Sequence, residues 1–239
     1  PQNLSGKQQI PACGLPISPS YEYASEKCNH KNKYLRVPKM ISDQLRCLYL
    51  HGFKSSPDSH KAQLTQAFFA KYDVAQNLHI PQLPPEPGKA MDDAQFLYEQ
   101  LIDEVGVENV LVIGSSLGGY YASYLAEHFG GRAALINPAV KPYELLRDYL
   151  GVNKNYHNDE TFIVTEDYIE ELRAIDVAPL RYPRHHLLLL KTQDETLDYR
   201  QAVSKYRNGP SFIEYGGDHS YQDYNLRLPS IMNFAASAY

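Results

Sequence analysis

Cysteine is scarce and tryptophan is absent in this chain of 239 residues, which holds three cysteines. Cys13, Cys28 and Cys47 are odd in number and widely spaced, which excludes the disulfide framework of a small secreted protein. The chain also lacks Cys-x-x-Cys and His-Glu-x-x-His spacings, and its nine histidines are scattered. We therefore expect no metal site.

Long hydrophobic runs are missing as well. No apolar stretch approaches the roughly 18 residues that a membrane-spanning helix requires. The chain shows no basic start followed by an apolar core and a cleavage site, which would mark a secretory signal. These absences predict a cytoplasmic protein with no membrane span.

Positive charge is in short supply over most of the chain, which has 23 Lys and Arg against 28 Asp and Glu. Residues 1–40 hold six basic and two acidic side chains, which leaves 17 basic and 26 acidic, a net charge of −9, for the remainder. Contacts with phosphate groups need clustered Lys and Arg, so the acidic body argues against nucleic-acid binding.

The first 39 residues show neither a helical nor a strand period, and they carry proline and glycine with few large aliphatic side chains. We predict a poorly ordered leader at residues 1–39 and a single domain at residues 40–239. Met40 lies shortly before the first strong strand, and we expect it to be the natural start. The alternative is a regulatory or targeting arm.

From residue 46 onward, short apolar runs alternate with segments of helical period. This order predicts an α/β fold with a mainly parallel sheet that is flanked by helices on both faces. Strands are expected at residues 46–50, 78–80, 110–113, 133–136, 187–190 and 212–215. Helices are expected at 61–72, 92–104, 118–128, 143–150 and 225–236, the last of them interrupted or delayed by Pro229. Residues 151–184 are polar, with one predicted helix at 166–174, and are interpreted as a cap-like insertion that shapes a substrate pocket.

The strongest motif is Gly-x-Ser-x-Gly at residues 114–118, directly after a predicted buried strand and directly before a predicted helix. That context is the nucleophile elbow of α/β-hydrolases, with Ser116 as the nucleophile and Gly114 and Gly118 where larger residues would clash. The N–H of Leu117 begins the helix and is a predicted oxyanion donor. Ser115 is the rival serine, and a glycine-rich turn without catalytic function is the plainer alternative.

A serine needs a base to remove its proton, and His219 lies in a glycine-rich loop after the last predicted strand. That is where the α/β-hydrolase fold places its histidine. The alternative is a histidine on a surface loop. His185 and His186 are expected at the entry of a strand, and His128 at the surface of a helix end.

Asp194 follows the predicted strand at 187–190 and is the expected acid. It gives the order Ser, Asp, His that this fold uses. Asp194 is also a candidate helix N-cap. The competing carboxylates are Glu195, Asp198 and Asp218.

His51, Gly52 and Phe53 follow the first predicted strand. Gly52 lets the backbone turn toward the elbow, and the Phe53 N–H is the predicted second oxyanion donor, as in the His-Gly motifs of lipases and esterases. A plain turn that ends the strand is the alternative, and His51 itself is interpreted as structural. Of Tyr120 and Tyr121, one is expected to line the pocket.

Several motifs, in order and spacing, resemble the YqiA esterase family. They are Leu48-Tyr49-Leu50-His51-Gly52-Phe53-Lys54-Ser55-Ser56-Pro57, Ile80-Pro81-Gln82-Leu83-Pro84-Pro85, Gly114 to Tyr121, Asn137-Pro138-Ala139-Val140, Asp194-Glu195, Leu197-Asp198-Tyr199-Arg200 and Gly217 to His219. The resemblance runs from about residue 47 to the C-terminus. It implies a small bacterial cytoplasmic esterase with the triad Ser116, Asp194 and His219. The chain departs from the family pattern at Gln193, where the family has glycine before the acid. Many α/β-hydrolases have extra antiparallel strands before the strand that precedes the His-Gly motif. Because residues 1–39 show no strand pattern, we expect a sheet that lacks these strands and is shortened at its N-terminal edge.

The predicted function is therefore hydrolysis of acyl esters through an acyl-enzyme, with a small-molecule substrate and no cofactor. An acyl-CoA thioesterase is a close alternative because the same triad opens thioesters, and peptidase and lyase activities are compatible with it. A haloalkane dehalogenase is disfavoured because the nucleophile is serine and no tryptophan is present to bind halide. A non-catalytic binding protein is the alternative from a different class. The sequence does not indicate the oligomeric state.

Overall fold

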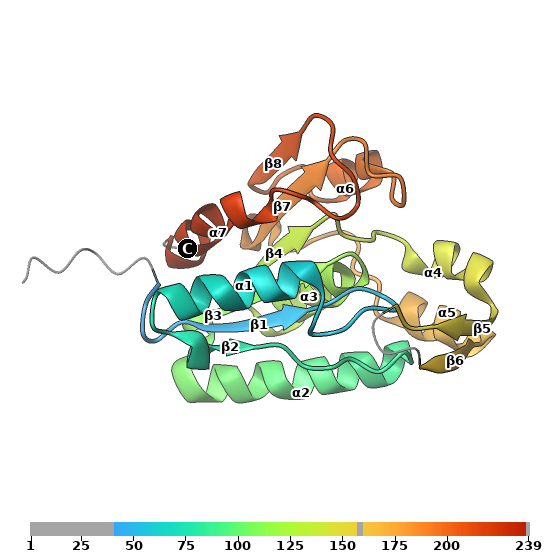
Figure 1. Ribbon diagram of the computed structural model, residues 1–239, viewed down its shortest axis with the longest axis horizontal. Coiled ribbons are helices and arrows are strands. Elements are labelled where there is room, and N and C mark those ends of the chain that lie inside the picture. Colours follow the sequence, from blue (N-terminus) through green and yellow to red (C-terminus); the bar gives the residue numbers. More distant parts are fainter. Residues whose placement is uncertain (1–40, 157–159, 238–239) are drawn as a thin grey trace, which may run out of the picture. The chain divides into compact units, whose positions relative to one another are not determined.

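The computed structural model describes residues 41–156 and 160–237, so the predicted leader lies outside the described residues. Six strands form the main sheet, in the order β2-β1-β3-β4-β7-β8, and every neighbouring pair is parallel (Figure 1). The strands are β1 (Arg46–Leu50), β2 (Leu78–His79), β3 (Val110–Ser115), β4 (Arg132–Ile136), β7 (His186–Lys191) and β8 (Ser211–Glu214).

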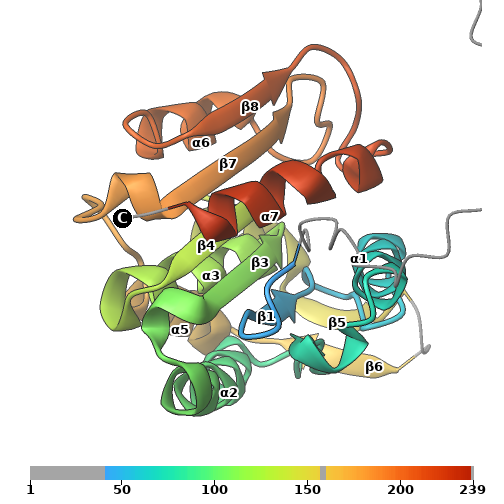
Figure 2. The ribbon, with the colours of Figure 1, turned by 90° about the vertical axis from the view of Figure 1, so that its left-hand side faces the viewer.

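Helices cover both faces of this sheet. Figure 2 shows α1 and α7 on one side of the strands and α2 and α3 on the other. The helices are α1 (His60–Lys71), α2 (Pro87–Val105), α3 (Leu117–Phe129), α4 (Pro142–Leu145), α5 (Glu166–Ala174), α6 (Tyr199–Lys205) and α7 (Leu228–Ala236). The predicted fold class, a mainly parallel sheet between two helical layers, is confirmed.

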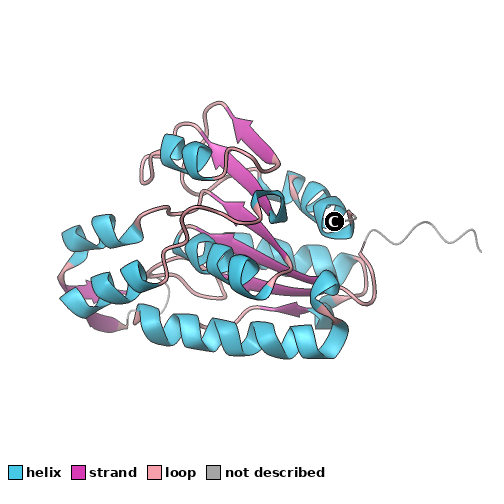
Figure 3. Ribbon diagram, turned by 180° about the vertical axis from the view of Figure 1, so that it is seen from behind, coloured by secondary structure: helices cyan, strands magenta, loops and turns pink. Residues whose placement is uncertain are grey.

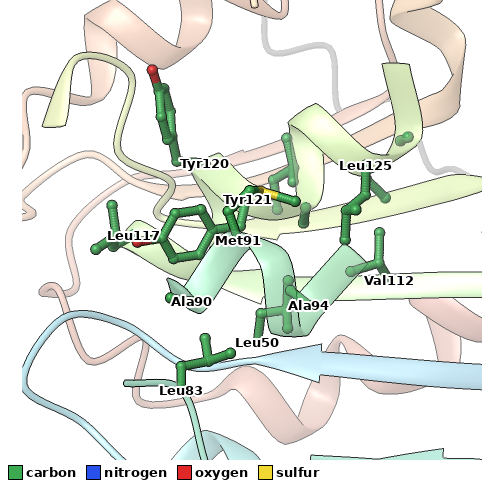
Figure 4. Close-up of a cluster of buried hydrophobic side chains, with 14 of the residues drawn as sticks. Leu50, Leu83, Ala90, Met91, Ala94, Val112, Leu117, Tyr120, Tyr121 and Leu125 are labelled. Carbon is green, nitrogen blue, oxygen red and sulfur yellow. The ribbon is translucent and has the colours of Figure 1, made fainter. Parts of the chain in front are cut away.

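The two cores follow from the alternation of side chains along the strands. In β1, Cys47 and Tyr49 belong to the core beneath α1 and α7, whereas Leu48 and Leu50 belong to the core beneath α2 and α3. Figure 4 shows Leu50 on the α2 side of the sheet. Because successive side chains point to opposite faces and both faces are covered, the central strands read as nearly continuous apolar runs.

Two predicted helix boundaries differ from the structure. The second helix begins at Pro87 rather than at residue 92, because the first turn is stabilised from outside: the Gly88 N–H donates to Glu171 of α5 at 2.9 Å. At the C-terminus, residues 224–226 form a 3₁₀ turn and α7 starts at Leu228, with Pro229 in its first turn, where proline is tolerated. Residues 143–150 are helical in part, as α4 followed by a 3₁₀ turn at Leu146–Tyr149.

The segment of residues 151–184 contains a β-hairpin that was not predicted. Strands β5 (Gly151–Lys154) and β6 (Thr161–Val164) pair antiparallel and are separate from the main sheet. Their four-residue length and mixed polarity leave no periodic signal. Helix α5 lies where the sequence predicted it. The hairpin, α4 and α5 lie beyond the carboxyl ends of the main strands (Figures 1 and 3).

Candidate active site

The turn between β3 and α3 presents Ser116. Its φ of 56° and ψ of −119° are rare for a residue with a side chain and mark a strained turn. Three backbone hydrogen bonds stabilise it: the Ser116 N–H donates to Ile136 at 3.0 Å, and the Ser116 carbonyl accepts from Gly119 and Ala139, each at 3.0 Å. Ser115, the rival serine, is buried as the last residue of β3, whereas Ser116 lines an open cleft.

The glycines of the motif are required by close backbone contacts. A Cβ atom on Gly114 would lie 2.3 Å from the carbonyl oxygen of Gly118. A Cβ atom on Gly118 would lie 2.1 Å from the carbonyl oxygen of Leu50. Neither oxygen can rotate away, so any larger residue at these positions would force β1, β3 and α3 apart.

The three residues predicted as a triad lie in contact. The Nε2 atom of His219 is 3.1 Å from the Ser116 Oγ, and its Nδ1 atom is 2.7 Å from the Asp194 Oδ2. The Asp194 side chain is 2% exposed and that of His219 is 23% exposed. In the tautomer that carries its proton on Nδ1, the imidazole donates to the carboxylate and presents Nε2 as an acceptor to the serine hydroxyl.

Asp194 also stabilises its own loop. Its Oδ1 atom accepts hydrogen bonds from the N–H groups of Thr196 at 2.8 Å and Leu197 at 2.9 Å. One carboxylate oxygen of Asp194 therefore accepts main-chain hydrogen bonds, as a capping residue does, while the other contacts His219. The helix that follows is capped by Asp198, which accepts from the N–H of Arg200 at 3.0 Å.

The other two competing carboxylates do not contact the His219 ring through any hydrogen bond among the described residues. Glu195 accepts from the His219 main-chain N–H at 3.0 Å. Asp218 accepts from the main-chain N–H of Ser220 at 2.9 Å. Both carboxylates therefore stabilise the loop of residues 216–220, which we call the histidine loop, rather than orient the imidazole.

Asn137 is a residue of the site whose position the sequence did not reveal. It lies buried at the end of β4, with a positive φ of 40°. Its Oδ1 atom accepts from the Lys191 N–H at 2.9 Å, and its Nδ2 atom donates to the carbonyls of Asp218 at 3.2 Å and His219 at 3.3 Å. One amide thus connects β4, β7 and the histidine loop. An asparagine before proline at the end of a central strand was the only sequence signal.

Two lysines, Lys191 and Lys61, contact the histidine loop. The buried Lys191 ammonium lies 2.5 Å from Glu214 and 2.6 Å from Asp223, and its hydrogen bond holds the pKa of Asp223 below its usual range. A Cβ atom on Gly217 would lie 2.6 Å from the Lys191 Cδ, so the loop runs directly over this side chain. Lys61 of α1 donates to the Ser220 carbonyl at 2.9 Å, and burial lowers the pKa of Lys61 to about 8.

The predicted oxyanion donors belong to Leu117, the residue after Ser116, and to Phe53 in the loop after β1. His51 is buried; its Nε2 atom accepts from the Leu83 N–H at 3.1 Å, which agrees with a structural role. A Cβ atom on Gly52 would lie 3.1 Å from the Ser116 Cβ, so this loop approaches the elbow closely. Within the described part of the chain, neither the Phe53 N–H nor the Leu117 N–H has a hydrogen-bond acceptor.

These groups open into a cleft of about 790 Å³, which lies within the usual size range of small-molecule sites. We call it the active-site cleft. Besides Ser116 and His219, its lining is largely apolar, with Asp148 and Glu195 as carboxylates. The apolar side chains come mainly from the segment after β4, from α5 and from the loop after Asp194, and include Pro142, Leu145, Leu146, Leu172 and Leu197. In the described ranges, no three His, Cys, Asp or Glu side chains gather as a metal site, and no helix is long and apolar enough to cross a membrane.

Comparison with known proteins identifies the family. The model of the uncharacterised protein family UPF0227 matches residues 46–236. The chain belongs to the UPF0227 family. A UPF0227 protein of Pasteurella multocida is 30% identical over 160 residues, which cover 66% of this chain and 80% of that protein. The UPF0227 protein YcfP of Salmonella gallinarum is 26% identical over 160 residues, or 65% of this chain and 79% of that protein.

Solved structures show which fold this UPF0227 member has. Est1E from Butyrivibrio proteoclasticus is similar with a TM-score of 0.57 at 17% identity, over 80% of this chain and 86% of that one. The esterase domain of a Rhodothermus marinus protein gives 0.56 at 17% identity, over 79% and 85%. A structure of the metagenome-derived lipolytic enzymes LipS and LipT gives 0.60 at 18% identity, over 82% and 94%. The UPF0227 chain therefore has the α/β-hydrolase fold.

Proposed function

We propose that this protein is a serine hydrolase that cleaves carboxylic acyl esters of small molecules. The observation that carries the proposal is the chain of contacts from Ser116 through His219 to Asp194, at 3.1 and 2.7 Å, which opens into a largely apolar cleft. The solved structures named as esterases or lipolytic enzymes share the fold and so support the class of reaction.

In the proposed mechanism, the Ser116 Oγ attacks the ester carbonyl carbon while His219 Nε2 takes the serine proton. The carbonyl electrons move to the oxygen, which the N–H groups of Phe53 and Leu117 stabilise. Each such donor is commonly worth about 3 kcal/mol in the transition state. When the tetrahedral intermediate collapses, the bond to the alcohol oxygen breaks and His219 gives the leaving alcohol its proton. Asp194 orients the imidazole and stabilises its charged form.

Water then repeats the sequence on the acyl-enzyme. His219 takes a proton from the attacking water, the bond from the carbonyl carbon to the Ser116 Oγ breaks, and the proton returns to the serine. The products are a carboxylic acid and an alcohol, and every step uses only side chains and amides of this chain. The apolar lining of the active-site cleft favours an uncharged acyl group.

The test is hydrolysis of p-nitrophenyl esters from acetate to palmitate by the wild type, Ser116→Ala and Ser115→Ala. We expect the Ser116 variant to lose about 10⁶-fold in kcat, as is usual for the nucleophile of a triad. Ser115→Ala is the matched control and keeps its activity, since Ser115 is buried at the end of β3 and is not among the residues that line the cleft. Equal activity of wild type and Ser116→Ala would contradict the proposal.

Two further measurements separate the alternatives. A fluorophosphonate probe that labels the wild type and not Ser116→Ala distinguishes a hydrolase from a non-catalytic binding protein, which would not react. Acyl-CoA substrates in the same assay measure the thioesterase alternative, because the same mechanism breaks a thioester bond.

A further inference from the structure

A second cavity of about 550 Å³ adjoins the active-site cleft. It contacts neither Ser116 nor His219, and it shares Phe53, Lys54 and Leu117 with the cleft. Besides the shared Phe53 and Leu117, its apolar lining residues are Leu83, Pro84, Pro85, Tyr121 and Phe162. Figure 4 shows Tyr121 directed toward Leu117, which lines both spaces. We call this space the second cavity.

The Phe53 ring stands between the two spaces. It packs edge-on against Tyr149 at 5.7 Å and 81°, and edge-on against Phe162 at 5.7 Å and 85°. Tyr149 lines the active-site cleft and not the second cavity, whereas Phe162 lines the second cavity and not the cleft. Phe53 is therefore the middle ring of a row of three, with one space on each side.

The other two shared residues are less able to open a passage. Leu117 is the first residue of α3 and is buried in the core beneath α2 and α3. The Lys54 ammonium lies over the rings of Tyr149 at 5.5 Å and Tyr156 at 4.7 Å. The ring of Phe53, by contrast, can be removed without changing its main-chain N–H, which is the group that the proposed mechanism uses.

We propose that the second cavity is an extension of the acyl-binding site, and that the Phe53 ring closes it and limits the acyl chain that this protein accepts. The inference rests on the proposed esterase function. The leaving alcohol must lie within reach of His219, which contacts the cleft alone, so the acyl chain is the part of the ester directed toward Phe53 and Leu117.

The chemistry of the lining indicates an uncharged hydrocarbon chain. Of the apolar side chains, Phe162 packs against Phe53 and Tyr121 is directed toward Leu117, whereas the carboxylates of Glu86, Asp93 and Glu160 and the ammonium of Lys54 also line the second cavity. Three carboxylates against one ammonium give this lining a net negative charge, which disfavours an acyl chain that ends in an acid because like charges repel. Burying one methylene is worth about 0.8 kcal/mol, which corresponds to about a fourfold gain in kcat/KM per methylene that enters the apolar part.

The experiment compares kcat/KM for p-nitrophenyl butyrate and p-nitrophenyl decanoate in four variants: Phe53→Ala, Phe162→Ala, the double variant, and Tyr149→Ala. We expect the decanoate-to-butyrate ratio to rise at least tenfold in Phe53→Ala. Phe162→Ala alone leaves the ratio within threefold of wild type because the partition is still closed, and it raises the ratio further in the Phe53→Ala background. Tyr149→Ala is the control, since it removes an equivalent contact with the Phe53 ring but touches only the cleft.

An unchanged ratio in Phe53→Ala, or an equal rise in Tyr149→Ala, would overturn the proposal. A gain seen with long-chain alkyl acetates rather than long acyl chains would also overturn it. If Phe53→Ala loses its cooperative unfolding transition, Phe53→Leu makes the same test with a smaller expected gain. Calorimetric binding of hexanoate and decanoate to wild type and Phe53→Ala needs no turnover. It therefore separates failure of the partition from failure of the esterase function, which Ser116→Ala tests.

Discussion

Replacing Gly118 by alanine sets two opposing effects against each other. Alanine is favoured over glycine in a helix by about 1 kcal/mol, and Gly118 lies in α3. The new Cβ atom, however, would lie 2.1 Å from the Leu50 carbonyl oxygen and 2.7 Å from that of His51. Both are main-chain atoms at the end of β1, so β1 and α3 must separate. Overpacking of this kind costs about 1–3 kcal/mol and occasionally more.

The contact is among the shortest that any added Cβ would make in the described residues, so we expect the steric cost to exceed the gain in helix propensity. Gly118→Ala should lose about 2 kcal/mol of unfolding free energy, or about 4–8 °C in Tm for a domain of this size. Activity should fall as well, because Ser116 lies two residues away and a displacement of about 1 Å can cost about 10²-fold. Urea and thermal unfolding, with p-nitrophenyl butyrate turnover, measure both effects.

Gly88→Ala is the matched control. Gly88 is also a helical glycine, but the atoms nearest to a Cβ there are those of the Glu171 carboxylate, at 3.1–3.3 Å, which is the far end of a flexible side chain. Helix propensity favours alanine by about 1 kcal/mol, and a weakened hydrogen bond from the Gly88 N–H to Glu171 costs about the same, so we expect a stability within about 1 kcal/mol of the wild type. The reasoning is refuted if Gly118→Ala is as stable as the wild type, or if Gly88→Ala loses as much stability as Gly118→Ala.

Three further predictions concern the residues around His219. Asp194→Asn should lower kcat by about 10⁴-fold, because an amide favours the wrong imidazole tautomer, whereas Asp198→Asn, the cap of α6, should leave kcat within about threefold; similar losses in both would contradict the triad. Asn137→Asp keeps the acceptor for the Lys191 N–H but turns an oxygen toward the carbonyls of Asp218 and His219. It should cost about 1–3 kcal/mol of stability by urea unfolding and lower kcat markedly, and a kcat within twofold of wild type would argue against this role. Lys61 has a folded-state pKa of about 8 against about 10.4 in an unfolded chain, so between these values the unfolded chain binds more protons and stability rises with pH. The stability of the wild type relative to Lys61→Met should therefore increase from pH 8 to pH 10, and a difference that is constant or falls would show that Lys61 has no such effect.

The main sheet was predictable because its information is local. In β3 and β7, consecutive apolar residues pack alternately into the two cores, so each strand is visible in the sequence as a short continuous apolar run. The helix after Ser116 was predictable for the same reason. The residues of the proposed triad were found by the elbow motif and by chain order, and the structure brings all three into contact. Their catalytic role stays a prediction.

Other features depend on contacts between distant segments. The hairpin of β5 and β6 has no local period, and α2 starts at Pro87 because Glu171 of α5 caps its first turn. Asn137 looked like the end of a strand, and only the folded chain places its amide between β7 and the histidine loop.

Taken by itself, the sequence determined which strands are buried and where the elbow lies, because backbone geometry links each side chain's direction to its position along the chain. The tertiary structure alone decided that Phe53 stands between two cavities, with Tyr149 on one side and Phe162 on the other. These three rings come from a loop after β1, a turn after α4 and a strand of the hairpin. No local pattern relates them, because their proximity arises only when β1, the insertion and α3 pack together.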